Sequence, residues 1–204
     1  MQITLNKWLK IKSYEFFYLE NTFNVVFIDK VPNDYKIIKK TKNKIFGPLN
    51  IISRSIVEPY QFKQNNYHVP FLKSHLQKCI RRQHIDQSIT TAYYLMSRDM
   101  NQFLRRILII IIEDTCLIKQ YIWLTWLMCA YPVYKINAEQ VYYILGIIKY
   151  LCQHIKDFTS EIKEINIIPT NDLVVSLLIR KSYGGMKCDM KMLQLYAQKW
   201  NKQR

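Results

Sequence analysis

The adjacent acidic residues Glu113 and Asp114, which follow a long apolar run, are the strongest candidates for chemistry in this sequence. A carboxylate pair can bind a divalent ion, but metal-dependent nucleases usually need three or more convergent carboxylates. Two arginine pairs, Arg81-Arg82 and Arg105-Arg106, belong to the same helical stretch and could neutralise these acids. We therefore predict a structural ion network formed by Arg105, Arg106, Glu113 and Asp114.

Other residues that could bind a metal or a cofactor are sparse. His75 and Cys79 have the spacing of neighbours on one helix face, but two ligands do not make a metal site. The paired glycines Gly184-Gly185 do not open a strand-to-helix phosphate loop, and no P-loop, H-E-x-x-H or G-x-S-x-G motif occurs. We expect no metal, no cofactor and no catalytic residue.

The basic residues are better functional candidates, because arginine makes bidentate contacts with phosphate and lysine supplies further positive charge. In the last part of the chain they alternate with Tyr183, Tyr196 and Trp200, a mixture suited to backbone contact and base stacking. Burial in the core is the favoured alternative for Trp200, and more strongly for Trp123 and Trp126. The predicted nucleic-acid-binding residues are Arg81, Arg82, Arg98, Arg105, Arg106, Lys181, Lys187 and Lys191.

The composition supports a polyanionic partner. The 204 residues include 30 Lys and Arg against 15 Asp and Glu, a net charge of +15. Such an excess favours nucleic acid or an anionic surface. Abundant Ile, Lys, Asn and Tyr suggest an AT-rich genome, for example viral, organellar or parasitic.

The cysteines and the apolar segments indicate an intracellular protein. Five cysteines, an odd number without C-x-x-C pairs, indicate a reducing compartment. The N-terminus lacks the apolar core of a secretory signal. The most apolar stretch, residues 120–134, is shorter than the roughly 18–20 residues that span a bilayer, so we predict a buried helix and no membrane span.

The elements that must position these residues fall into two parts. Residues 1–69 combine an opening helix with short β-type runs such as 23–28 and 37–38, separated by turns at 31–34 and 46–48. The lysine-rich residues 36–44 are predicted to form a solvated basic hairpin or loop. We therefore expect residues 1–69 to form an N-terminal appendage with short strands.

Residues 70–204 have helical periodicity. Leu72, Leu76, Cys79 and Ile80 recur at the spacing of one helix face. Four helices are expected at about 70–82, 119–131, 170–181 and 187–201. Three more are expected to begin after Asp86 as N-cap, near Asp99, and after Asn137 as cap. The predicted fold is mainly α, a helical bundle with a small N-terminal α/β or extended appendage, divided into domains 1–69 and 70–204.

Residues 72–118 resemble the C-terminal helical region of the replication-associated recombination protein A family of AAA+ ATPases, and the resemblance extends more loosely to about residue 156. Its most specific part is the order R-R, seven residues, E-D. The sequence departs from the family at Cys116, where the family has glycine, and at Arg82 and Gln83. The matching residues are Lys78, Arg81, Asp86, Ala92, Tyr93, Arg105, Arg106, Glu113, Asp114 and Leu117.

The resemblance implies a helical collar that holds AAA+ subunits together during work on DNA forks, without ATPase activity of its own. Our first hypothesis is a non-catalytic basic protein of a DNA replication or repair apparatus, which binds the nucleic-acid backbone and either itself or an AAA+ ATPase. DNA is preferred to RNA as the nucleic acid. One alternative is an RNA-binding structural subunit, for example of an organellar ribosome. The other is a metal-dependent nucleic-acid enzyme that uses Glu113 and Asp114.

Overall fold

The structure is a computed structural model that describes residues 16–19, 23–28, 30–43, 47–54, 58–156 and 170–202. The predicted opening helix lies outside these residues. The chain is mainly helical, as predicted, and divides into two compact units that are interleaved along the sequence. Unit 1 contains residues 1–55, 119–133 and 168–204, and unit 2 contains residues 56–118 and 134–167.

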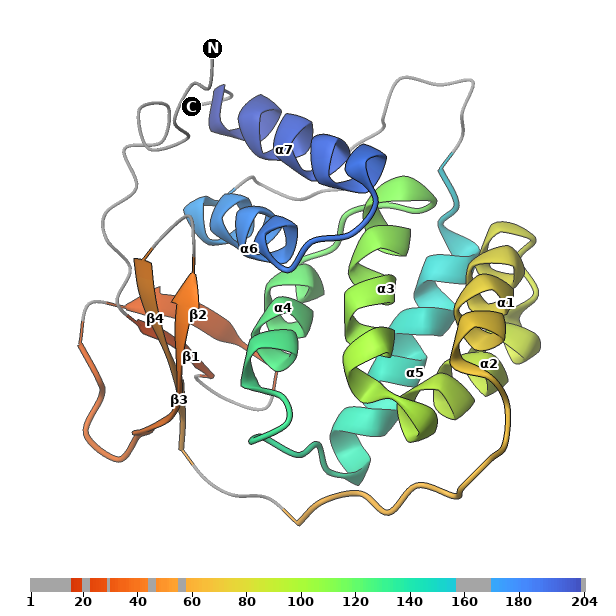
Figure 1. Ribbon diagram of the computed structural model, residues 1–204, viewed down its shortest axis with the longest axis horizontal. Coiled ribbons are helices and arrows are strands. Elements are labelled where there is room, and N and C mark those ends of the chain that lie inside the picture. The colour runs from red at the N-terminus through yellow and green to blue at the C-terminus, as the bar shows by residue number, and fades with distance from the viewer. Residues whose placement is uncertain are drawn as a thin grey trace. The chain divides into compact units, whose positions relative to one another are not determined.

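In its described residues, unit 1 combines a small mixed sheet with three helices (Figure 1). The strand order is β2-β1-β4-β3, with β1 and β4 parallel and the other two pairings antiparallel. Its elements are β1 (Phe16–Leu19), β2 (Val25–Ile28), β3 (Lys36–Asn43), β4 (Gly47–Ser53), α4 (Gln120–Ala130), α6 (Asn171–Ser182) and α7 (Lys187–Lys202).

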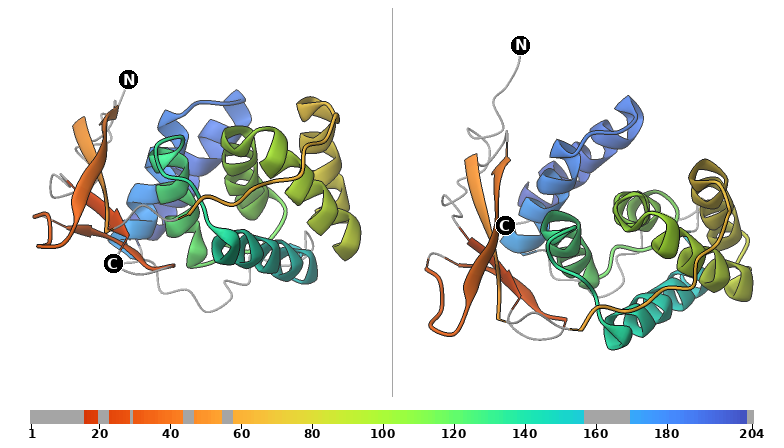
Figure 2. Two further views of the ribbon diagram at one scale, coloured as in Figure 1. Left: turned by 90° about the horizontal axis from the view of Figure 1, so that it is seen from below. Right: turned by 60° about the horizontal axis from the view of Figure 1, so that its bottom comes forward.

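The apolar helix α4 is the centre of unit 1. It contacts all four strands and α6, and α6 packs in turn against α7. Figure 2 shows α4 beside the sheet in both views. Trp123 and Trp126 are buried in this packing, and Leu49 and Ile51 of β4 are buried as well. The predicted buried helix is thus confirmed, and no helix in the described part of the chain is long and apolar enough to cross a membrane.

The lysine-rich segment predicted as a solvated hairpin or loop contains strand β3, which lies at an edge of the sheet. Lys36 and Lys40 are exposed, but Lys39 turns toward the C-terminal end of α4. Its Nζ donates to the carbonyl oxygens of Cys129, at 2.7 Å, and of Tyr131, at 2.6 Å. These carbonyls lack partners within the helix, so the charge of Lys39 satisfies the helix end.

Unit 2 is a cluster of four helices: α1 (Val69–Arg81), α2 (Ile85–Arg98), α3 (Met100–Glu113) and α5 (Ala138–Gln153). Helices α1 and α2 form an antiparallel hairpin, and α2 also packs against α3 and α5. Figure 2 shows α5, in teal, next to this hairpin. The chain after α5 is fixed to the end of α3, since Lys156 N donates to Asp114 O at 3.0 Å.

N-caps were predicted at Asp86 and Asn137, and a further helix was predicted to begin near Asp99. The Asn137 cap and the helix start at Asp99 are confirmed. Asp99 Oδ1 accepts from Gln102 N at 2.9 Å, and Asn137 forms a capping box at the start of α5. Asp86 was the wrong choice, because the N-cap residue of α2 is His84. The tight turn after α1, with Gln83 at φ 59°, lets α2 begin at Ile85, which places Asp86 inside its first turn.

The compact units do not follow the predicted division at residues 69 and 70. Helices α4, α6 and α7 belong with the strands rather than with α1, α2, α3 and α5. The physical reason is α4, whose residues are apolar on nearly every side and therefore require cover on several sides. The sheet provides part of that cover.

Candidate nucleic-acid interface

Helix α1 carries three stripes of side chains that face different surroundings. The first is the predicted core stripe, and all four of its members are buried: Leu72, Leu76, Cys79 and Ile80. Burial raises the pKa of the Cys79 thiol, which keeps this cysteine in its unreactive protonated form. The stripe anchors α1 in unit 2 and leaves the polar positions on either side of it for other contacts.

The second stripe faces α3 and is called here the α1–α3 ladder. It is formed by Lys73, Gln77 and Arg81 on α1 and by Gln102, Arg106, Glu113 and Asp114 on or next to α3. Lys73 Nζ donates to Gln102 Oε1 at 2.9 Å. Four residues further along α1, Gln77 accepts from Arg106.

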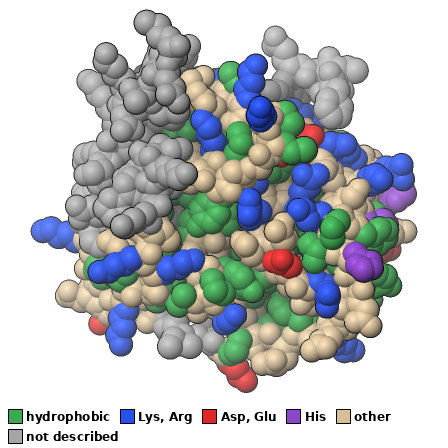
Figure 3. Space-filling view, viewed as in Figure 1, with side chains coloured by type: hydrophobic (Ala, Val, Ile, Leu, Met, Phe, Trp, Pro, Cys, Tyr) green, Lys and Arg blue, Asp and Glu red, His purple; other side chains and the backbone are tan. Residues whose placement is uncertain are grey.

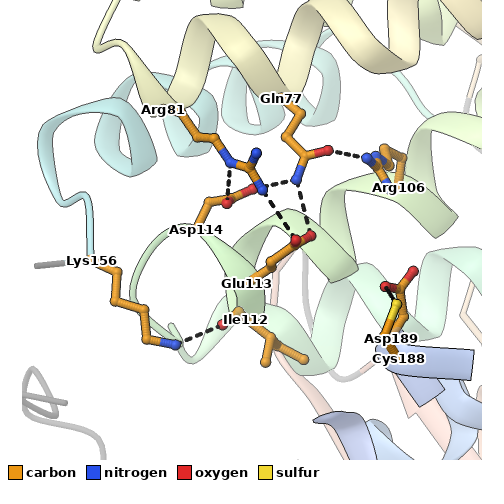
Figure 4. Close-up of polar contacts among 9 residues, drawn as sticks. All are labelled: Gln77, Arg81, Arg106, Ile112, Glu113, Asp114, Lys156, Cys188 and Asp189. Carbon is orange, nitrogen blue, oxygen red and sulfur yellow. Dashed lines mark hydrogen bonds and ion pairs between the residues drawn. The ribbon is translucent and has the colours of Figure 1, made fainter. Parts of the chain in front are cut away.

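At its far end the ladder holds both acids by hydrogen bonds and ion pairs (Figure 4). Gln77 Nε2 donates to Glu113 Oε2 at 3.0 Å and to Asp114 Oδ2 at 2.6 Å. Arg81 donates to Asp114 Oδ1, and to Glu113 Oε1 at 3.1 Å. Each of the four carboxylate oxygens thus accepts a hydrogen bond from α1, which argues against a role for this pair in holding a catalytic metal.

The cation that pairs with both acids is Arg81, which the sequence indicated both as a possible partner of these acids and as a nucleic-acid-binding residue. Asp114 is only 1% exposed, so its charge requires a close partner. The hydrogen bond from Arg81 to Asp114 is the main reason that the pKa of Arg81 is raised. Of the predicted partners, Arg106 joins the network through the Gln77 amide, and Arg105 is half-buried on α3.

The third stripe of α1 is open to solvent. Phe71, His75, Lys78 and Arg82 are spaced by four, three and four residues, so they follow one line along the helix. The antiparallel helix α2 presents a matching line beside it, formed by Gln87, Thr91, Tyr94 and Arg98. We call the surface between these two lines the α1–α2 groove.

The groove contains a pocket of about 380 Å³. Its volume lies within the range of roughly 300–1,000 Å³ that is common for small-molecule sites. The pocket has an aromatic side and a side that carries hydrogen-bonding groups. It is lined by Tyr67, Phe71, Leu72, His75, Asp86, Gln87, Thr90, Thr91 and Tyr94.

The aromatic side of the pocket is a row of nearly parallel rings. The centroids of Tyr67 and Phe71 are 6.4 Å apart with an interplanar angle of 27°, and those of Phe71 and His75 are 5.3 Å apart at 22°. Tyr94 of α2 lies 5.2 Å from Tyr67 at 31°. Tyr67 is 49% exposed and Phe71 is 53% exposed, so the row presents ring surface to solvent rather than to the core.

The segment before α1 holds this row in place. Asn65 Nδ2 donates to Tyr94 O at 3.1 Å and also to Ser97 Oγ. Lys63 N donates to the hydroxyl of Tyr93 at 3.2 Å. Within the row, His75 Nδ1 is 2.9 Å from Thr91 Oγ1, which connects α1 to α2 at the middle of the groove.

Lys78, Arg82 and Arg98 provide positive charge on the same two lines. All three are exposed, and none forms an ion pair within the part of the chain that is described. Lys78 and Arg98 belong to last helical turns, where a cation also stabilises the helix dipole. At the right-hand edge of Figure 3, over α1, histidine and hydrophobic side chains lie beside Lys and Arg side chains.

The remaining predicted basic residues are in unit 1. Lys187 and Lys191 are exposed on α7, whereas Lys181, on α6, donates to Gln194 of α7. Trp200 is only 2% exposed, in agreement with the core alternative for this residue. The lysines of α7 can therefore contact phosphate. Trp200 is buried, so it provides no surface beside them for stacking a base.

The aromatic row was not predicted, and His75 was expected to be a partly exposed imidazole rather than a metal ligand. The available signal was the spacing of Tyr67, Phe71 and His75, four residues apart and away from the core stripe. His75 Nδ1 lies 3.5 Å from Cys79 Sγ, but the described residues include no group of three side chains that could hold a metal ion.

Comparison of this chain with known protein families, with curated proteins and with solved structures finds no match.

Proposed function

We propose that this chain is a non-catalytic nucleic-acid-binding protein of a DNA replication or repair apparatus, and that it holds single-stranded nucleic acid in the α1–α2 groove. The observation that supports this proposal best is the row of exposed rings flanked by exposed cations. Proteins that bind single strands combine aromatic stacking surfaces with a positively charged path for the backbone. The groove contains both components.

The charges of the chain support the same assignment. The net charge of +15 attracts polyanions over a range of several ångströms. Arg81 is paired with Glu113 and Asp114 in the α1–α3 ladder. Lys78, Arg82 and Arg98 are exposed at the groove and can contact a nucleic acid. From Phe71 to Arg82 the line on α1 extends about 16 Å, since a helix rises 1.5 Å per residue.

A partner is the second part of the proposal. Through the resemblance of residues 72–118 to the collar region, we infer association with an AAA+ ATPase or with further copies of this chain. The measurement is the mass of the protein in solution, alone and with a collar-containing ATPase. If the protein is a monomer and does not bind the ATPase, the proposed association is wrong, but the proposal for the groove is unaffected.

The test of the groove is a matched pair of triple variants. Lys78→Ala, Arg82→Ala and Arg98→Ala together should weaken binding of a labelled single-stranded oligonucleotide at least tenfold. Each lost phosphate contact should also lower the slope of log K against log salt by about 0.7. The control removes the same charge elsewhere, with Lys36→Ala, Lys40→Ala and Lys149→Ala, all of which are exposed.

The two variants separate a specific site from general charge attraction. If both weaken binding equally, the groove has no special role and the proposal is wrong. Tighter binding of duplex DNA than of a single strand would also contradict it, because a stacking surface requires unpaired bases. A strong preference for RNA of the same sequence would favour the RNA-binding alternative.

A further inference from the structure

The pocket in the α1–α2 groove has one chemically distinctive side that general strand binding does not use. Besides the aromatic row, the lining of the pocket includes four polar residues of α2: Asp86, Gln87, Thr90 and Thr91. Asp86 is exposed and forms no ion pair within the described residues. A carboxylate among cations weakens attraction for phosphate, but its two oxygens can accept hydrogen bonds from a ligand that carries donor groups.

We propose that the pocket receives one unstacked guanine base, held by the aromatic row and read at its edge by Asp86. This inference rests on the proposed function of the groove. An ionised carboxylate only accepts hydrogen bonds. The Watson–Crick edge of guanine presents two neighbouring donors, N1–H and the N2 amino group, which match the two oxygens of one carboxylate. The Gln87 amide can donate to the neighbouring O6 acceptor.

The geometry of the rings favours a flat ligand over a bulky cation. Sites for quaternary ammonium groups are aromatic cages, in which several rings surround the charge. Here the interplanar angles along Tyr67, Phe71 and His75 are 27° and 22°, so the rings form a row rather than a box. The cations Lys78, Arg82 and Arg98 would also repel a positively charged ligand.

The other bases fit the polar side less well. Adenine and cytosine each present a single exocyclic amino group next to an acceptor nitrogen, and that acceptor would face the carboxylate. Thymine presents one donor between two carbonyl oxygens. Stacking on the aromatic row is available to all of them, because every base has a flat ring face. Specificity therefore depends on Asp86, and general affinity depends on the row.

The experiment measures how four oligonucleotides bind to the full chain. Each is a dT strand with a single variable base at its centre: guanine, adenine, cytosine or thymine. The guanine strand should bind at least fivefold more tightly than the others, as expected for a bidentate contact. Asp86→Asn should remove this preference, because the amide offers only one acceptor oxygen in place of two. Phe71→Ala should weaken all four strands about tenfold.

The outcomes separate this inference from the proposed function. Equal binding of the four strands, with dependence on Lys78, Arg82 and Arg98 intact, would overturn the guanine pocket and leave the groove proposal standing. No binding of any strand would overturn both. A preference that survives in Asp86→Asn would also overturn the pocket, as would tighter binding of a trimethyllysine peptide than of the guanine strand. Thermal melting of each variant shows whether it is folded.

Discussion

The α1–α3 ladder and the α1–α2 groove lie on two sides of one helix and use similar residue types in opposite ways. In the ladder, Gln77 and Arg81 are satisfied by groups of α3 and the residue that follows it. In the groove, Arg82 and Arg98 have no acidic partner within the described residues. A cluster of polar residues therefore identifies a binding surface only when its members are left unsatisfied by the protein itself.

The neighbouring residues Arg81 and Arg82 illustrate this difference most directly. Both are arginines in or next to the last turn of α1, and both are exposed as whole residues. Only Arg81 reaches Asp114, whose side chain is buried. Their substitution should therefore have opposite consequences for stability and for binding.

The largest expected effect is on folding. Arg81→Ala removes the cation beside buried Asp114 and should lower the free energy of unfolding by about 2–3 kcal/mol, because Gln77 alone cannot neutralise the charge. Arg82→Ala should change it by less than about 0.5 kcal/mol. Urea unfolding of the two variants measures both values. If both variants lose the same free energy of unfolding, the pairing of Arg81 with Asp114 does not stabilise the protein more than the exposed Arg82 does.

An intermediate effect is expected at the centre of the ladder. Gln77→Leu keeps the side-chain size but removes the amide that joins Arg106 to both acids, so we expect a loss of about 1–2 kcal/mol. Unfolding by urea measures the change, and nucleic-acid binding should stay at the wild-type level. A variant that binds poorly while remaining stable would assign the ladder to the binding surface instead.

The smallest expected change in stability comes from replacing the acidic residues at the starts of two helices in unit 2. Asp99→Ala removes the N-cap of α3 and should cost about 1 kcal/mol. Asp86→Ala removes no cap and should cost only a few tenths of a kcal/mol, since Asp86 interacts only with the start of α2 through its charge. Thermal melting checks both. A larger loss for Asp86 would show that its role is structural and would weaken the guanine pocket.

The sequence predicted local structure well because local signals decide it. The core stripe of α1 and the caps at Asp99 and Asn137 follow from helical spacing and from side chains that bond to nearby amides. The cap at Asp86 was wrong because the tight turn at Gln83 starts α2 earlier than the side-chain signal suggested.

Long-range pairing was harder to predict. Two arginine pairs, Arg81-Arg82 and Arg105-Arg106, were candidate partners for Glu113 and Asp114, and the predicted network contained the second pair. The ion pairs are instead made by Arg81, more than 30 positions away. The order of residues cannot show which turns of two packed helices meet. For the same reason the groove was missed, since it forms only when Tyr94 of α2 lies beside Tyr67 and Phe71.

The interleaving of the two units has a consequence for synthesis on the ribosome. Domains generally fold as their residues emerge. The strands emerge first, but α4 follows after α3, and α6 and α7 come last. Unit 2 can therefore close while unit 1 is still unfinished. During this wait Lys36 and Lys40 of β3, which are exposed on an edge strand, discourage pairing with strands of other nascent chains.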